Sequence, residues 1–298
     1  MTYAIHPFQL HQPATVDEAL ALAADPLVRR HVPILAEAAG VVAGPTIRGM
    51  GTLGGNLCLD TRCRYYNQSY FWRQANDFCL KKEGSVCHVA PGGSFCWAAY
   101  SGDTGPALLL LDAELELAGP EGVRRVPLRE FYGSDGRWSI GTEPGKKRPG
   151  GKRPGELLLR VHVPIPAAGW HGVYEKLRVR DSIDYPLVGV ALRARFDGKS
   201  DAPAPRIAEL RLALTAVNPR PECVPGLEEF AGQAFDLSLL EALQRKANKV
   251  GKPMRTAVAD PAYRRSMIGA LVAKAAARLV PTLGEALAKQ QQQQRAAG

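Results

Sequence analysis

The sequence lacks the features of a membrane or secreted protein. Its 298 residues contain no run of about 18 to 20 apolar residues, the length a helix needs to cross a bilayer. Residues 1–7 form neither a basic nor an apolar segment, so we expect no signal peptide. Six cysteines are also far fewer than a disulfide scaffold carries. These absences predict a cytoplasmic protein with reduced thiols and no membrane partner.

Several binding signatures are absent as well. There is no closely spaced Cys-x-x-Cys pair of a zinc ribbon, no Walker lysine and no dinucleotide-binding glycine spacing. Hydrophobic residues make up 46% of the chain and charged residues 22%, which excludes wholesale disorder. The length suits one large domain or two ordinary ones.

Acidic residues are fewer than basic residues, 29 against 38, which gives a net charge of +9. Residues 146–155 hold five of the positive charges together with prolines and glycines that prevent regular structure. We expect an exposed basic loop over 144–155, either a contact for nucleic acid or an acidic partner, or a solvated insertion. No aromatic residue lies among these charges, so the insertion is favoured and no nucleic-acid partner is predicted.

The first half of the chain predicts short elements. A capping box at 15–18 begins a short helix, and apolar residues at helical spacing predict a second helix over 26–43. The apolar run 106–111 predicts a short helix. Alternating residues around a Gly-Pro turn predict a hairpin over 114–126, and 157–163 is predicted to be a strand.

The second half predicts a sheet followed by helices. Residues 173–179, 187–196 and 207–217 alternate between apolar and polar, which is typical of a half-buried antiparallel sheet of three strands. Asp236 and Asp260 are N-caps of two amphipathic helices. Strands followed by helices indicate an α+β fold. The glutamine-rich residues at 286–298 predict a disordered tail.

Residues 44–105 show no periodicity but contain two candidate sites. The turn Thr52-Leu53-Gly54-Gly55-Asn56 either lets the backbone approach an anion or is an ordinary tight turn. The second candidate is a set of four cysteines separated by 16, 8 and 9 residues, Cys63, Cys79, Cys87 and Cys96. Their spacing is compatible with a metal or iron–sulfur site and with free thiols of no special role.

These residues resemble a known family. The segment Ile47–Cys58 resembles the second flavin-binding signature of the FAD subunits of molybdenum hydroxylases. Residues 60–63 and 66–69 resemble one branch of that family, the beta subunit of 4-hydroxybenzoyl-CoA reductase, and the resemblance resumes at 174–181. It implies a truncated FAD-binding domain over 1–166 with a cysteine-rich cluster loop at 60–100. A domain of sheet and helical bundle is implied over 167–285.

The resemblance also implies two cofactors. The four cysteines match the ligands of a [4Fe-4S] cluster in order and spacing, whereas Cys58 and Cys223 are not expected to be ligands. The implied FAD contacts are Val42, Thr52, Leu53, Gly54, Gly55, Asn56, Asp103, Leu158 and Lys176. No catalytic residue is expected on this chain, because the molybdenum centre of the family lies on another subunit.

The function implied by the resemblance is electron transfer within a 4-hydroxybenzoyl-CoA reductase. Electrons from ferredoxin would pass through the [4Fe-4S] cluster and FAD toward a large molybdenum subunit, by way of a small subunit with two [2Fe-2S] clusters. An earlier family signature, Ala-Gly-Gly-Thr-Asp, is missing here, and a block of the first subdomain with it. That departure leaves an alternative, a degenerate assembly subunit without flavin.

Overall fold

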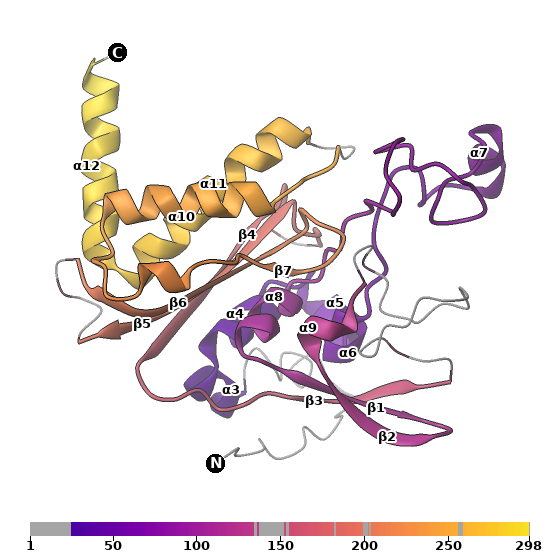
Figure 1. Ribbon diagram of the computed structural model, residues 1–298, viewed down its shortest axis with the longest axis horizontal. Helices are drawn as coiled ribbons and strands as arrows, with labels where there is room; N and C mark the ends of the chain where they lie inside the picture. The colour runs from indigo at the N-terminus through magenta and orange to yellow at the C-terminus, as the bar shows by residue number, and fades with distance from the viewer. Residues whose placement is uncertain are drawn as a thin grey trace.

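The computed structural model describes residues 25–133, 136, 152, 155–181, 183–198, 202, 204–255 and 259–297. The predicted helix after the capping box at 15–18 and nearly all of the basic loop at 144–155 lie outside these residues. Two antiparallel sheets form the framework, one in each half of the chain (Figure 1).

The first half combines small helices with a three-stranded sheet. Its sheet has the order β2-β1-β3, and β1 pairs with both neighbours. The strands are β1 (Glu114–Gly119), β2 (Gly122–Pro127) and β3 (Leu157–His162). The helices are α3 (Pro26–His31), α4 (Pro33–Gly40), α5 (Pro45–Met50), α6 (Leu53–Leu57), α7 (Tyr70–Ala75), α8 (Thr104–Leu110) and α9 (Leu128–Phe131). The predicted hairpin, the strand at 157–163 and the short helix near 106–111 are therefore confirmed.

The second half contains the three predicted strands and the predicted helices, but its sheet has a fourth, two-residue strand, so the prediction of three strands is wrong. Its sheet has the order β4-β5-β6-β7, with β4 (Trp170–Leu177), β5 (Val188–Asp197), β6 (Arg206–Thr215) and the two-residue β7 (Glu222–Cys223). A short 3-10 helix, η1 (Glu228–Phe230), precedes the helices α10 (Leu237–Val250), α11 (Pro261–Leu279) and α12 (Pro281–Ala297). Asp236 and Asp260 cap α10 and α11 as predicted, each accepting a backbone N–H three residues on.

The main sheet is buried on both faces, not on one. Val190 and Leu192 of β5 pack with α10 and α11 in one apolar core, and Ala191 belongs to the core of the first half. Arg193 lies in the polar position that the alternation assigned to solvent, yet it is buried and donates to the carbonyl of Leu110 in α8. The prediction of a half-buried sheet is wrong because α4 and α8 cover its second face (Figure 1).

Two further predictions differ from the structure. The helix predicted over 26–43 is two helices, because Pro33 has no N–H to donate and disfavours helical geometry at Val32. Residues 286–297 of the tail predicted to be disordered belong to the helix α12, which begins at Pro281. Glutamine is a good helix former, so a polar composition did not exclude a helix there.

The cysteine-rich residues form a lobe that projects from the body and carries α7 (Figure 1). The bridge Arg62↔Ala99 closes the base of this lobe with two backbone hydrogen bonds. Within the described ranges, no helix is long and apolar enough to span a membrane.

Candidate flavin site and cysteine lobe

A cavity of about 490 Å³ lies where the Gly-Gly turn, the start of α8 and the β4–β5 loop meet. Its volume falls within the range of small-molecule sites. The sequence-predicted residues that line it are Val42, Thr52, Leu53, Gly55, Asn56 and Asp103. Side chains of the β4–β5 loop, among them Ile183 and Tyr185, line the cavity as well.

Buried tyrosines and a capping threonine hold the Gly-Gly turn in place. Thr52 caps α6 by accepting the N–H of Gly55 at 2.9 Å. Asn56 accepts the N–H and the hydroxyl of Thr104 at 3.1 and 2.7 Å, which joins α6 to the start of α8. The phenol of Tyr100 donates to the Asn56 carbonyl at 3.0 Å, and Tyr132 supports the next carbonyl in the same way. The turn is therefore rigid before any ligand binds.

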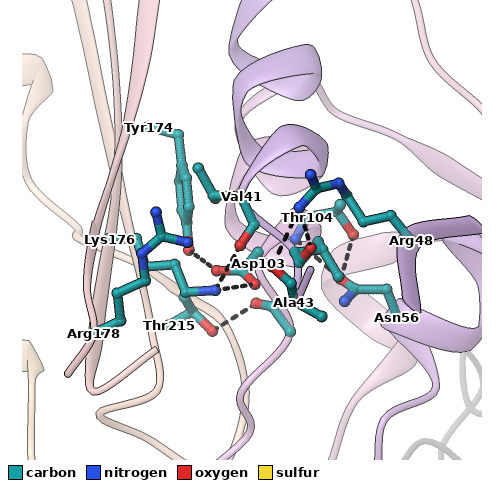
Figure 2. A network of polar contacts seen from close by, with 12 residues as sticks. Val41, Ala43, Arg48, Asn56, Asp103, Thr104, Tyr174, Lys176, Arg178 and Thr215 are labelled. Atoms are coloured by element: carbon teal, nitrogen blue, oxygen red, sulfur yellow. Dashed lines mark hydrogen bonds and ion pairs between the residues drawn. The ribbon is translucent and has the colours of Figure 1, made fainter. Parts of the chain in front are cut away.

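A buried ion pair joins the two halves of the chain beside the cavity (Figure 2). The ammonium of Lys176 on β4 lies 2.9 Å from one carboxylate oxygen of Asp103 and 2.8 Å from the carbonyl of Val41. The phenol of Tyr174 donates to the other Asp103 oxygen at 2.8 Å. Burial raises the pKa of Asp103 to about 6, while Lys176 and Tyr174 oppose the shift. Burial also lowers the pKa of Lys176.

Gly102, directly before Asp103, is required by close packing. A Cβ atom there would lie 2.2 Å from the Tyr100 phenol oxygen and 2.7 Å from the Asn56 carbonyl oxygen. Both neighbours are fixed by the hydrogen bonds around the turn, so neither can move aside cheaply. The glycine thus allows Asp103 to reach the wall of the cavity.

The remaining chemistry of the cavity suits an anionic ligand. Arg48 lines it and donates to the carbonyls of Val42 and Ala43 at 2.7 and 3.2 Å. The Nε of Arg48 is buried without a hydrogen-bond partner among the described residues. Burial lowers the pKa of Arg48, and the nearby charge of Arg178 lowers it further. A cation beside a glycine turn favours a pyrophosphate group, so Arg48 and the Gly-Gly turn fit FAD at this end of the cavity.

Three of the predicted flavin residues lie behind the cavity wall. Lys176 reaches the cavity only through Asp103. Leu158 of β3 packs against Gly54, where an added Cβ atom would lie 3.4 Å from a Leu158 methyl. Arg48 and Tyr100 are not among the sequence-predicted site residues: Arg48 lies in the flavin-like segment Ile47–Cys58 but outside its Gly-Gly turn, and Tyr100 lies outside that segment. Tyr174 and Lys176 are two residues apart and therefore lie on the same face of β4. This spacing could have pointed to Tyr174.

Within the cysteine lobe, Cys63 lies in electrostatic range of Cys79, Cys87 and Cys96. Cys79, Cys87 and Cys96 are buried, and Cys63 is half-buried. Burial raises the pKa of Cys96 to about 11, Lys81 lowers it, and the thiols of Cys87 and Cys63 raise it. Burial likewise raises the pKa of Cys63, with the Cys79 and Cys87 thiols adding to the shift. Backbone N–H groups donate to the sulfurs of Cys63 and Cys96 at 3.5 and 3.3 Å.

The surroundings of these thiols are aromatic and contain two buried cations, Lys81 and Arg73, whose side chains are each 8% exposed. Lys81 lies over the ring of Tyr66 and is held by the side chains of Asp60 and Thr61. Tyr65 packs on His88, the residue after Cys87, at a ring separation of 5.1 Å. Among the residues that the structure describes, no three Cys, His, Asp or Glu side chains are close enough to hold a single metal ion.

Comparison with known proteins relates both halves of the chain to one family. The FAD binding domain in molybdopterin dehydrogenase matches residues 19–166. The CO dehydrogenase flavoprotein C-terminal domain matches residues 173–279. The carbon monoxide dehydrogenase structure from Hydrogenophaga pseudoflava has the same fold, with a TM-score of 0.61 at 24% identity, and the match covers 88% of this chain and 73% of that one.

Two relatives illustrate the range of similarity. The putative xanthine dehydrogenase FAD-binding subunit XdhB of Escherichia coli is 27% identical over 87% of this chain and 70% of its own length. The aldehyde oxidoreductase FAD-binding subunit PaoB of the same organism is 36% identical over 59% of this chain and 55% of its own length. The shorter match has the higher identity.

Proposed function

Since the chain belongs to the family of FAD-binding subunits of molybdenum-containing dehydrogenases, we propose that it is an electron-transfer subunit that binds FAD in the cavity beside Asp103. The observation that carries the proposal is the rigid Gly-Gly turn with Arg48 and the Asp103–Lys176 pair around one cavity. The turn amides and Arg48 would face the pyrophosphate. FAD supplies the ability to take up and release electrons one or two at a time.

Asp103, positioned by Lys176, would hold the end of the ligand that reaches the β4 strand. Asp103 lines the cavity and can accept a hydrogen bond from a ligand N–H or O–H group. Lys176 and Arg178 place positive charge next to that carboxylate, which favours a ligand that gains negative charge when it is reduced. These residues would position the ligand and stabilise its reduced form. No catalytic residue is assigned to this chain.

A [4Fe-4S] cluster on Cys63, Cys79, Cys87 and Cys96 is the second part of the proposal. Four thiols around a four-iron cube lie farther apart than four ligands of one ion, because each binds a different iron. The proximity of the thiols, their burial and the N–H donors to sulfur support such a site. Its electrons would be exchanged with a ferredoxin.

The partners proposed for the assembled enzyme are a large molybdenum subunit and a small subunit with two [2Fe-2S] clusters. Two substrates are candidates for the molybdenum subunit. The residues of the cysteine loop resemble 4-hydroxybenzoyl-CoA reductase, whereas the 36% identity with PaoB favours an aldehyde. Purified complex should therefore be assayed with both 4-hydroxybenzoyl-CoA and an aromatic aldehyde, and turnover of only one decides between them.

The cluster is tested by iron analysis of the complex purified without oxygen. Replacement of Cys87 by alanine should remove about four irons per chain relative to the wild type. The irons of the other subunits are present in every preparation, so the difference in iron content between wild type and variant reports the cluster of this chain alone. Cys223→Ala is the matched control, because Cys223 lies on β7 in the other half of the chain and should leave the iron content unchanged. Equal iron in all three preparations would contradict the cluster.

A further inference from the structure

A basic groove of about 530 Å³ lies between the cysteine lobe and the flavin cavity. It shares Ser101, Asp184 and Tyr185 with the cavity and is lined by Cys63 on its other side. Five of its 14 lining residues are arginines, and Asp184 is the only acidic one. The arginines are Arg62, Arg64, Arg180, Arg255 and Arg264.

The described part of the chain neutralises only one of the five arginines of this groove. The carboxylate of Asp184 is taken up by Arg180, which donates its backbone N–H at 2.6 Å and its side-chain Nε at 3.0 Å. The buried Arg264 is held by backbone carbonyls, including that of Leu187 at 3.0 Å, and has no acidic partner among the residues described. Arg64 and Arg255 are exposed and likewise have no described ion-pair partner.

Apolar and aromatic groups lie among these charges. Val179 is 64% exposed and Tyr185 is 44% exposed, and the guanidinium of Arg62 lies 4.3 Å from the centre of the Tyr185 ring. Exposed arginine and tyrosine side chains in one place are typical of the centre of a protein interface. A groove rimmed by exposed arginines suits acidic side chains of another protein better than an enclosed small molecule.

We propose that this groove is the docking surface for an acidic one-electron carrier protein. The inference rests on the proposed function, because the carrier needs a redox centre at Cys63 and its companion thiols. Charge complementarity selects the occupant, since three exposed arginines of the groove, Arg62, Arg64 and Arg255, have no ion-pair partner among the described residues. One electron would move per encounter between the carrier and that centre, and two encounters account for a two-electron change in the substrate. Electrostatic steering speeds such brief encounters.

The test uses the whole complex and a purified acidic [2Fe-2S] ferredoxin. In the double variant Arg64→Glu/Arg255→Glu, kcat/KM for the ferredoxin should fall at least about 10-fold at low salt and depend less on salt than in the wild type. The rate with methyl viologen, a small cationic mediator, should stay within about twofold of wild type, since it requires no acidic docking partner. Arg129→Glu/Arg245→Glu, which changes the net charge equally at exposed positions outside the groove, should behave as wild type.

Three results would overturn the inference: an unchanged ferredoxin rate, an equal loss in the control variant, or failure of the groove variant to assemble with the other subunits. The last would make the groove a permanent subunit interface. Ferredoxin binding is measured separately by calorimetry. Arginine-dependent binding by a complex without the four additional irons would support the docking surface and contradict the cluster. Iron-loaded complex with no arginine dependence would contradict the docking surface alone.

Discussion

Replacing Lys176 by methionine should strongly destabilise the chain, because it leaves the carboxylate of Asp103 without its cation. The side chains of the pair are only 3% and 4% exposed, and the two groups are 2.9 Å apart. Breaking a buried pair by removing one partner costs about 3–5 kcal/mol. The carbonyl of Val41 also loses its donor. We expect a loss of about 3–5 kcal/mol in the free energy of unfolding at pH 8, measured by urea denaturation of the full chain.

The loss should also depend on pH. The pKa of Asp103 is about 6, so the wild-type pair is ionised at pH 8 and mostly protonated on Asp103 at pH 5. Removal of Lys176 therefore costs less at pH 5 than at pH 8. The double variant Asp103→Asn/Lys176→Met should recover part of the stability, because no buried charge remains.

An exposed pair provides the control. Arg195 and Glu209 pair across β5 and β6, with side chains 38% and 43% exposed. Arg195→Met should cost less than about 1 kcal/mol. A loss below about 1 kcal/mol in Lys176→Met, or one that does not shrink at pH 5, would refute the assigned burial and charge of the pair.

The other predictions concern the same wall of the cavity. Gly102→Ala should lose about 1–3 kcal/mol through the clash with a phenol and a carbonyl, whereas Gly92→Ala, which has nothing within 4 Å of the new methyl, should stay within about 0.5 kcal/mol in thermal unfolding. Tyr132→Phe should cost about 1 kcal/mol in the same assay, because the buried Leu57 carbonyl loses its donor. Asp103→Asn should remove a pH dependence. The folded-state pKa of about 6 lies above the unfolded value of 3.8, so the folded state holds the proton more tightly and wild-type stability should fall as pH rises from about 4 to 6. If the stability of the wild type and of Asp103→Asn changed in parallel over this pH range, the raised pKa of Asp103 would be contradicted.

Alternation and capping predicted the main strands and the helices α10 and α11, because each depends on local pattern. Local pattern could not show that Arg193 is buried. The alternation of strand residues is the same whether an arginine side chain is hydrated or donates to the carbonyl of Leu110. Composition failed for residues 286–297 of α12, because the helix propensity of glutamine and alanine outweighed their polar or low-complexity character. The first of these errors concerns a tertiary contact made by a residue that looks polar in sequence.

The parts of the candidate site that are continuous in sequence were predicted, whereas the contacts between distant residues were not. The turn around Gly54 and Gly55 is a continuous segment, so the sequence shows it directly. Asp103 and Lys176 are 73 residues apart, and only the family resemblance joined them before the structure did. Arg48 and Tyr100 act through one or two contacts each, which no spacing reveals.

The central claim, that this chain binds FAD without the earlier glycine signature, is tested most directly by titration of the flavin-depleted protein with FAD. Quenching of flavin fluorescence should be saturable, with about one FAD per chain and a Kd of about 1 μM or tighter. Gly102→Ala should weaken binding, whereas Gly92→Ala should not. Absence of saturable binding up to about 100 μM FAD would contradict the claim and favour a degenerate assembly subunit without flavin.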